Sequence, residues 1–466
     1  MGTLDELFLS KKDIPYITFT DCPRTYSFGQ IYDLSDRLAY LFEKQGVTNR
    51  TKAIILINNC IEDVLAYFAM LKLGAIPILL DGNSSVSDVI SISQQCDASI
   101  IVGGSRKDGF NETIQFSVNS LELLNTYKKY TFEMLEMSES IIACLCTSGS
   151  RGDHKIVKLL YKGWLESAYI FVELIKYNVD MRVLQMMPLF HGTGWFTTCI
   201  LPLVSGTRIF VLENSLSRFF KIWDIVNDNK INYLVLMPSI MSTMLMINPE
   251  PVSNPIQYVN SSSDYLSPLL KMSFEKNFNL KIIEDYSSTE AGIISVTDLN
   301  CCNDSVGRLA NISETIIDDT GEILVNTKDI FGGYFGWDKK DNWFHTGDIG
   351  YIKDDFLFLT GRKDDRININ GEKFYPKTID EIMMYSDLIQ DSFTVYYNEK
   401  IITFVVLVDS QKEFVDGDIN KLLKEFFFQR SGFSWCPYRF YIIDSLPLNT
   451  VGKVNKKALL SLICGE

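Results

Sequence analysis

Residues 52–81 read KAIILINNCIEDVLAYFAMLKLGAIPILLD, and this stretch decides the fold class. Residues 53–58 form a short run rich in β-branched side chains, which predicts a buried strand. Residues 60–73 carry apolar side chains at helical spacing up to a glycine, and residues 75–80 form a second apolar run. Strand, helix and strand in this order are the βαβ unit of a parallel sheet. The sequence therefore predicts an α/β protein whose strands are buried on both faces.

The rest of the chain divides into three regions of different pattern. Further apolar runs continue the alternation at residues 99–102, 141–146, 183–187, 208–212, 233–237 and 281–283. After about residue 300, shorter runs separated by turn residues predict antiparallel hairpins, which form a small barrel or an edge sheet. From Asp364 the sequence again shows a mixture of helical and strand patterns. We predict a large domain over residues 1–361, with stacked α/β sheets and a small β-barrel-like subdomain, and a small mobile α+β domain over residues 362–466.

The composition is that of a globular protein with large cores, because 46% of the 466 residues are hydrophobic and 22% are charged. The net charge of -14 argues against a nucleic-acid partner, which would require a basic face. Ten cysteines without a CxxC pair indicate reduced thiols in a cytoplasmic protein. Three widely spaced histidines argue against structural zinc. We also expect no signal peptide and no membrane span.

The loop TSGSRGDHK, residues 147–155, is the strongest local signal for chemistry. Glycines let backbone N–H groups turn toward an anion, hydroxyls donate to phosphate oxygens, and a lysine adds a point charge. It is not a Walker A loop, because residues 156–160 continue as a strand rather than a helix. Alone, it is equally typical of a hydroxyl-rich hairpin turn. The candidate phosphate ligands are Thr147, Ser148, Gly149, Ser150, Gly152 and Lys155.

Four further segments follow this loop in a fixed order. They are YSSTE at 286–290, WFHTGD at 343–348, GRKDD at 361–365 with GEK at 371–373, and LPLNTVGK at 446–453. With the loop, they resemble the ordered motifs of the adenylate-forming ligases, the superfamily of acyl-CoA synthetases, carrier-protein adenylation domains and firefly luciferase. Five motifs in order are far more specific than any one of them. The resemblance implies ATP-dependent activation of a carboxylic acid to an acyl adenylate with release of pyrophosphate, and then transfer to a thiol.

The resemblance also implies a role for each motif. Tyr286 would stack on adenine, Thr289 would contact the α-phosphate, and Glu290 would hold Mg2+. Asp348 and Arg362 would bind the ribose, and an ionised carboxylate suits this because it accepts two donors at once. Seen singly, these motifs are also typical of ordinary turns. The remaining candidates on the nucleotide side are Ser262, Ser263, Asp264, Asp285, Ser287 and Ser288.

Two residues of the small domain receive roles by the same resemblance. Lys453 would reach both the carboxylate and the α-phosphate during adenylation, since a long cationic side chain after a glycine is mobile. Gly371 would line the tunnel for a pantetheine thiol, where the backbone must approach the thiol arm closely. In isolation, a surface charge and a hairpin glycine would explain these residues equally well.

The segment MPLFHGTGW, residues 187–195, resembles the part of the family that encloses the acid. His191 stands where amino-acid-activating relatives carry an aspartate for the substrate ammonium. An unpaired buried ammonium costs several kcal/mol, so we predict an acid without an α-amino group, either aryl or fatty. The candidate substrate residues are Phe190, His191, Gly192, Trp195, Met237, Ser261 and Gly292. The apolar members are equally typical of an ordinary core.

Departures from the family pattern leave alternatives open. Arg151, His154 and Ser287 replace the usual threonine, proline and glycine, which bears on ATP affinity. The acceptor is either CoA or the phosphopantetheine of a carrier protein. A non-catalytic nucleotide-binding or regulatory relative and an amino-acid-activating carrier-protein ligase are the other two hypotheses.

Overall fold

The structure is a computed structural model of the chain. It describes residues 2–20, 22–103, 113–133, 140–148, 154–212, 221–247, 256–297, 305–310, 313–337, 339, 341–369, 372–408, 416–433, 435–448 and 454–463. Among these residues no helix is both long and apolar enough to cross a membrane. Within the same part of the chain, the six cysteines whose pairing can be judged are free thiols.

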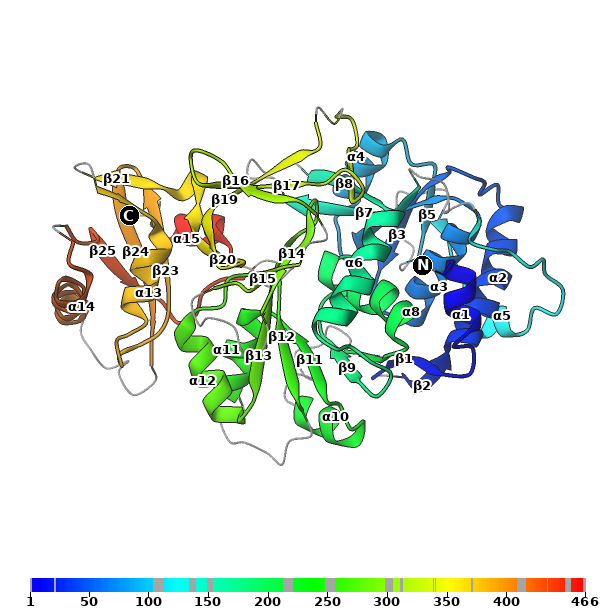
Figure 1. The fold of residues 1–466 in the computed structure, drawn as a ribbon, viewed down its shortest axis with the longest axis horizontal. Coiled ribbons are helices and arrows are strands. Elements are labelled where there is room, and N and C mark those ends of the chain that lie inside the picture. The colour runs from blue at the N-terminus through cyan, green and yellow to red at the C-terminus, as the bar shows by residue number, and fades with distance from the viewer. Residues whose placement is uncertain are drawn as a thin grey trace.

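A large sheet runs through the molecule and changes character part of the way across (Figure 1). Strands β1 and β9 to β13 follow the predicted βαβ pattern and pair in parallel. In order, its strands are β16 (Thr315–Ile317), β17 (Glu322–Asn326), β19 (Trp343–Lys353), β20 (Phe356–Arg362), β15 (Arg308–Leu309), β14 (Gly292–Val296), β13 (Lys281–Ser288), β12 (Tyr258–Ser261), β11 (Tyr233–Leu236), β9 (Arg182–Gln185), β10 (Arg208–Val211), β1 (Pro15–Phe19) and β2 (Cys22–Ser27).

A second sheet contains the stretch that predicts the fold class. Residues 52–57 and 76–81 form neighbouring parallel strands joined by a helix, as their pattern predicts. β7 and β8 pair as an antiparallel hairpin, so the predicted phosphate loop connects two strands. In order, the strands are β18 (Phe331–Tyr334), β8 (His154–Leu160), β7 (Ile141–Ser148), β4 (Ile76–Asp81), β3 (Lys52–Ile57), β5 (Ile100–Val102) and β6 (Thr113–Ile114).

Helices cover both sheets and bury their apolar faces in two main clusters. One cluster joins α10, α11 and α12 to one face of β11, β12 and β13. The other joins the opposite face of these strands to the second sheet and its helices. The helices are α1 (Leu4–Leu9), α2 (Phe28–Lys44), α3 (Ile61–Lys72), α4 (Val86–Cys96), α5 (Val118–Glu122), α6 (Tyr161–Leu174), α7 (Gly192–Trp195), the π-helical η2 (Phe196–Ile200), α8 (Leu201–Ser205), α10 (Ile222–Asp228), α11 (Pro238–Ile247) and α12 (Pro268–Phe278).

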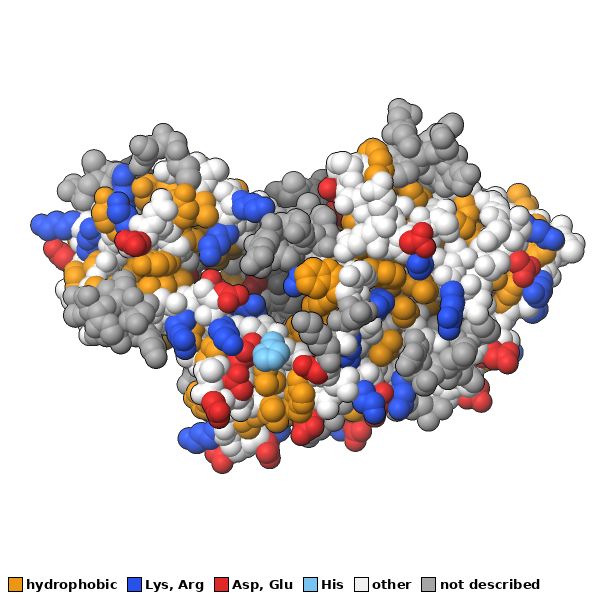
Figure 2. All heavy atoms as spheres, turned by 90° about the horizontal axis from the view of Figure 1, so that it is seen from above, with side chains coloured by type: hydrophobic (Ala, Val, Ile, Leu, Met, Phe, Trp, Pro, Cys, Tyr) orange, Lys and Arg blue, Asp and Glu red, His pale blue; other side chains and the backbone are white. Residues whose placement is uncertain are grey.

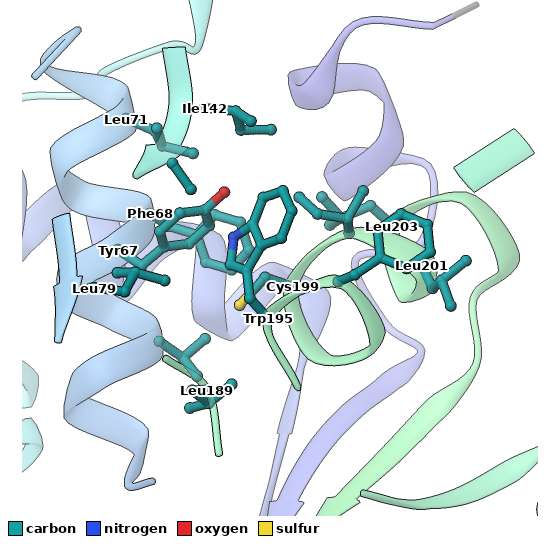
Figure 3. Packing of buried hydrophobic residues seen from close by; sticks show 14 of the residues in the cluster. Tyr67, Phe68, Leu71, Leu79, Ile142, Leu189, Trp195, Cys199, Leu201 and Leu203 are labelled. Atoms are coloured by element: carbon teal, nitrogen blue, oxygen red, sulfur yellow. The ribbon is translucent and has the colours of Figure 1, made fainter. Parts of the chain in front are cut away.

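Trp195 lies at the centre of the larger cluster. Figure 3 shows its ring between Tyr67 and Phe68 of α3 and the leucines of α8. The ring is fully buried and makes edge contacts with Tyr67, at 6.4 Å between centroids, and with Trp164, at 5.2 Å. This packing fixes the segment that carries His191 against the second sheet.

β13 is the strand where the large sheet changes from parallel to antiparallel. Residues 281–284 pair in parallel with β12, and residues 285–288 pair antiparallel with β14. The short strands that follow extend this sheet as an open antiparallel edge. Of the two sequence alternatives, the edge sheet is therefore the observed one, because β15 pairs with both β14 and β20 and so ties these strands to the main sheet.

The residues after Arg362 form separate, smaller sheets on the left of Figure 1. Their largest core packs α13 and α14 against a three-stranded sheet of β23, β24 and β25. These elements are η3 (Lys363–Asp365), β21 (Ile367–Ile369), β22 (Glu372–Phe374), α13 (Pro376–Met383), β23 (Ile389–Tyr397), β24 (Lys400–Leu407), α14 (Asp416–Ser431), β25 (Arg439–Ile442) and α15 (Lys456–Ile463). The α+β character predicted for this region is confirmed, whereas its mobility and the exact boundary stay predictions.

Candidate active site

A cavity of about 1180 Å3 lies where β11, β12 and β13 end, between the large body and the smaller elements after Arg362. Figure 2 shows the surface indented between the lobe on the left and the larger body. Residues from both sides line the cavity, including Asp285 of β13, Asp348 of β19 and Lys377 of α13. The end of parallel strands is the usual place for a ligand in such sheets, because the loops there diverge.

Asp348 and Arg362 form one polar cluster of the cavity. β19 and β20 pair Asp348 directly opposite Arg362, and the Arg362 Nη1 group donates to Asp348 Oδ1 over 2.9 Å. The hydroxyl of Tyr286 donates to Asp348 Oδ2 over 2.6 Å. Gly347 has a φ of +73°, and a Cβ at this position would lie 2.8 Å from Arg362 Nη2. The glycine of the HTGD motif therefore makes room for the guanidinium.

Glu290 lies in a second cluster with Tyr334 and Lys155. The Tyr334 hydroxyl donates to Glu290 Oε1 over 2.8 Å, and Lys155 Nζ lies 5.3 Å from the centre of the Tyr334 ring. Burial raises the pKa of Glu290, while the Tyr334 hydrogen bond and the nearby Lys155 oppose the rise. A single carboxylate beside a cavity suits Mg2+, which is commonly held by one or two carboxylates together with substrate phosphates.

The predicted acid segment adjoins the YSSTE motif. A Cβ on Gly192 would lie 3.8 Å from Thr289 Oγ1, so the two segments are in contact. The backbone N–H of Thr193 donates to His191 Nδ1 over 3.3 Å. Thr193 Oγ1 lies 3.2 Å from Ser262 Oγ and 2.8 Å from Ser263 Oγ. The serines predicted on the nucleotide side thus also touch the acid segment.

Asp285 accepts hydrogen bonds from three neutral side chains. Asn260 Nδ2 donates to Oδ1 over 3.0 Å, and the hydroxyls of Ser262 and Ser287 donate to Oδ2 over 2.9 and 2.8 Å. Burial raises the pKa of Asp285 and the three donors oppose the rise. Ser287, which departs from the family glycine, therefore has a defined partner.

The cavity brings most of the predicted site residues together. Those that line it are Thr147, Lys155, His191, Gly192, Ser261, Ser262, Ser263, Asp264, Asp285, Tyr286, Ser287, Ser288, Thr289, Glu290, Gly292, Asp348 and Arg362. Gly149, Ser150, Gly152, Gly371 and Lys453 lie outside the described residues, as does the side chain of Ser148.

Three predicted substrate residues lie elsewhere. Trp195 and Met237 are buried in the larger core cluster, and Phe190 packs against it, and none of the three lines the cavity. These three side chains therefore pack as ordinary core residues, which is the other interpretation of their sequence pattern. The apolar wall of the cavity instead includes Trp164, Phe171 and Leu201.

The junction with the small domain contains residues that the motifs do not indicate. Tyr265 donates through its hydroxyl to Glu381 of α13, and Lys377 Nζ lies 3.0 Å from the centre of the Tyr265 ring. A Cβ on Gly361 would lie 2.5 Å from the ring of Tyr375, so only glycine fits between β20 and α13. Spacing carries no signal for these contacts, because they join segments far apart in the chain.

The family model described as "AMP-binding enzyme" matches residues 10–335. The chain belongs to the family of AMP-binding enzymes. Oxalate--CoA ligase of Saccharomyces cerevisiae is 27% identical over 385 residues, which cover 76% of this chain and 69% of the relative. Indoleacetate--CoA ligase of Aromatoleum aromaticum is 24% identical over 488 residues and 94% of either chain.

Solved structures share the fold of this AMP-binding enzyme over nearly its whole length. ATP-bound MatB from Rhodopseudomonas palustris superposes with a TM-score of 0.86 at 17% identity, covering 99% of this chain and 98% of that one. The anthranilate CoA ligase AuaEII in complex with anthranoyl-AMP gives 0.86 at 16% identity, covering 100% and 98%. The mixed α/β fold predicted from sequence is confirmed.

Proposed function

We propose that this AMP-binding enzyme activates a carboxylic acid with ATP, forming an acyl adenylate and pyrophosphate, and then transfers the acyl group to the thiol of CoA. The observation that carries the proposal is the single cavity lined by Asp348, Arg362, Thr289 and Glu290 together with the acid segment at His191. A carboxylate must meet the α-phosphate there, and the two anions need donors and cations arranged in advance.

The following cavity residues are each assigned a role in binding and orienting ATP. Asp348 accepts the ribose hydroxyls, and Arg362, which donates to it over 2.9 Å, holds the carboxylate in place. Tyr286 stacks on adenine, and Thr289 donates to the α-phosphate next to Gly192. Glu290, with Lys155 nearby, would hold Mg2+, and the bound ion would neutralise charge on the phosphates.

Lys453 is proposed as the residue that bridges the carboxylate and the α-phosphate during adenylation. The described residues on either side, Leu448 and Val454, pair with each other and both line the cavity. This placement supports the proposal, because an extended lysine side chain attached near a cavity wall reaches across it. Gly371 is proposed to line the passage for the pantetheine arm.

CoA is the acceptor that the relatives favour, since the curated ones named above are CoA ligases. The reaction balances: the thiol replaces AMP on the acyl carbon and gives a thioester and free AMP. The alternative acceptor is the phosphopantetheine thiol of a carrier protein. Comparing CoA with a phosphopantetheinylated carrier protein as acceptor, after the same acid has been adenylated, distinguishes them.

Pyrophosphate release with a panel of aryl and fatty acids tests the function. We expect ATP- and acid-dependent release, its loss in Lys453→Ala, and thioester formation by that variant from supplied acyl adenylate. Lys457→Ala, on the exposed side of α15, is the matched control. If ATP binds but no acid elicits release, the non-catalytic alternative is correct. If Lys453→Ala adenylates normally, the proposed role of the lysine is wrong.

A further inference from the structure

Asp285 is a carboxylate on the cavity wall that the proposed reaction does not use. Among the described residues it forms no ion pair, and its three partners, Asn260, Ser262 and Ser287, are all uncharged. Asp285 is half-buried, so a charge there without a cation is only partly solvated, and the hydrogen bonds from neutral donors offset only part of that cost. The arrangement is therefore incomplete until a ligand supplies a donor or a positive charge.

The carboxylate has acceptor capacity left for such a ligand. An ionised carboxylate offers about four lone-pair positions, and three are taken by the donors at 2.8 to 3.0 Å. Oδ1 accepts only from Asn260, whereas Oδ2 accepts from both serines. The open position is thus on Oδ1.

Asp285 and Tyr286 face opposite sides of the sheet, so that Asp285 points toward the acid segment and Tyr286 toward the ribose cluster. Successive residues of a strand face opposite sides of the sheet, so Asp285 and Tyr286 diverge. Tyr286 bonds Asp348 of the ribose cluster. Asp285 bonds Ser262, which lies 3.2 Å from Thr193 of the acid segment. Its neighbours on β12 and β13, Asn260 and Ile283, share this face.

Among the described residues, the part of the cavity wall contributed by α6, η2, α8 and α11 carries no charged side chain. The lining residues contributed by α6, η2, α8 and α11 are Trp164, Phe171, Phe196, Thr197, Leu201, Pro238, Ser239 and Ser242. All are apolar or neutral. A ligand that meets this wall and Asp285 together has an apolar body and a nitrogen that donates hydrogen bonds. A second carboxylate on the acid would face Asp285 and be repelled.

We propose that Asp285 binds an amino group carried by the acid on a carbon other than the α carbon, so that the enzyme prefers amino-substituted monocarboxylic acids. This inference rests on the proposed function. It agrees with His191, which by resemblance replaces the aspartate of amino-acid-activating relatives, whereas the carboxylate of Asp285 lines the same cavity.

Matched acid pairs test the preference. The pairs are meta- and para-aminobenzoic against benzoic acid, and γ-aminobutyric and δ-aminovaleric against butyric and valeric acid. We expect at least one amino member to exceed its unsubstituted partner by about tenfold or more in kcat/KM for pyrophosphate release, roughly the value of one charge-assisted hydrogen bond. Asp285→Asn should abolish that ratio.

The controls separate the ways in which this inference could fail. Asp228→Asn, exposed on α10, should keep the wild-type preference. Preference for the unsubstituted acids overturns the proposal. So does an Asp285→Asn variant that raises KM for ATP but keeps the acid ratio, because the donor would then be the adenine amino group. Thermal unfolding of each variant shows that it is folded, and Asp285→Ser replaces Asp285→Asn if that variant is not.

Measuring acid binding without ATP tests the role of Asp285 independently of the proposed reaction. If the wild type releases no pyrophosphate with any acid, the proposed function fails. Calorimetric titration of the same acid pairs without ATP then decides on Asp285. Tighter binding of an amino member to the wild type, lost in Asp285→Asn, supports the site, and equal binding of both members overturns it.

Discussion

Asp348 shows how much a single side chain contributes when its partners are fixed by strand pairing. The β19–β20 register places Arg362 opposite it, and Tyr286 reaches it from β13. Asp348→Asn keeps the shape but removes the charge. We expect kcat/KM for ATP to fall by about 10- to 100-fold, since charge-assisted hydrogen bonds are worth about 1.5–3 kcal/mol. Steady-state kinetics with ATP varied at saturating acid measures this.

The control for that variant lies on the same hairpin. Asp355 is exposed in the turn between β19 and β20 and has a φ of 66°, which asparagine tolerates. Asp355→Asn should leave the ATP kinetics unchanged. A normal KM for ATP in Asp348→Asn would contradict the ribose assignment.

The ordered motifs could predict the polar site but not its apolar wall. Glu290, Asp348 and Arg362 are the charged residues of motifs that resemble those of the adenylate-forming ligases, and all three line the cavity. Trp195 is a candidate pocket residue in the sequence, but cores and pockets use the same side chains. Only the packing shows that Trp195 is buried and that Trp164 lines the cavity.

Among the elements, α2 and α3 are held together by a buried ion pair. Lys72 Nζ lies 2.7 Å from Asp36 Oδ1, both side chains are fully buried, and the ammonium lies 3.2 Å from the centre of the Tyr32 ring. The backbone N–H of Tyr130 also donates to Asp36. Burial lowers the pKa of Lys72 to about 8, although Asp36 opposes the shift.

Lys72→Met leaves Asp36 buried with only the exposed Lys129, whose Nζ lies 3.4 Å from Asp36 Oδ2, as a cation. We expect a loss of about 3–5 kcal/mol in the free energy of unfolding, as for other broken buried pairs, measured by urea denaturation. Lys128→Met is the matched control, because Lys128 is exposed and its ion pair with Glu43 is worth at most about 1 kcal/mol. Adding Asp36→Asn to Lys72→Met should recover part of the loss. Equal stability of the two lysine variants would refute this account.

At this scale the βαβ elements are predictable because their periodicity is local. Residues 52–57, 61–72 and 76–81 form the expected strand, helix and strand. The edge strands could be predicted as hairpins but not as part of the main sheet. That depends on β15 pairing with β20 across more than forty intervening residues, and sequence spacing does not encode such a contact.

In the whole molecule, the contact between Tyr265 and α13 joins the large body to the elements after Arg362, and we expect it to respond to pH. Burial lowers the pKa of Lys377 from 10.5 to about 8, with Glu381 opposing the shift. The docked state thus binds the proton more weakly than an undocked lysine. Docking is therefore weakest below pH 8 and strengthens as the pH rises from about 8 toward 10.5.

Small-angle scattering across this pH range measures the docking. We expect the radius of gyration to fall as the pH rises in the wild type, and to be insensitive to pH in this range in Lys377→Met. Lys400→Met, exposed at the start of β24, should behave as the wild type. A wild-type radius that grows with pH would show that the sign is wrong.

The change of pairing within β13 also limits how the protein can evolve. Because side chains alternate along a strand, inserting or deleting one residue before Asp285 would exchange the faces of the carboxylate and Tyr286. The adenine stacking proposed for Tyr286 and the acid recognition proposed for Asp285 would be lost together. New acid preferences can therefore arise through substitutions at fixed positions of β12 and β13, whereas changes in chain length are tolerated only in the surrounding loops.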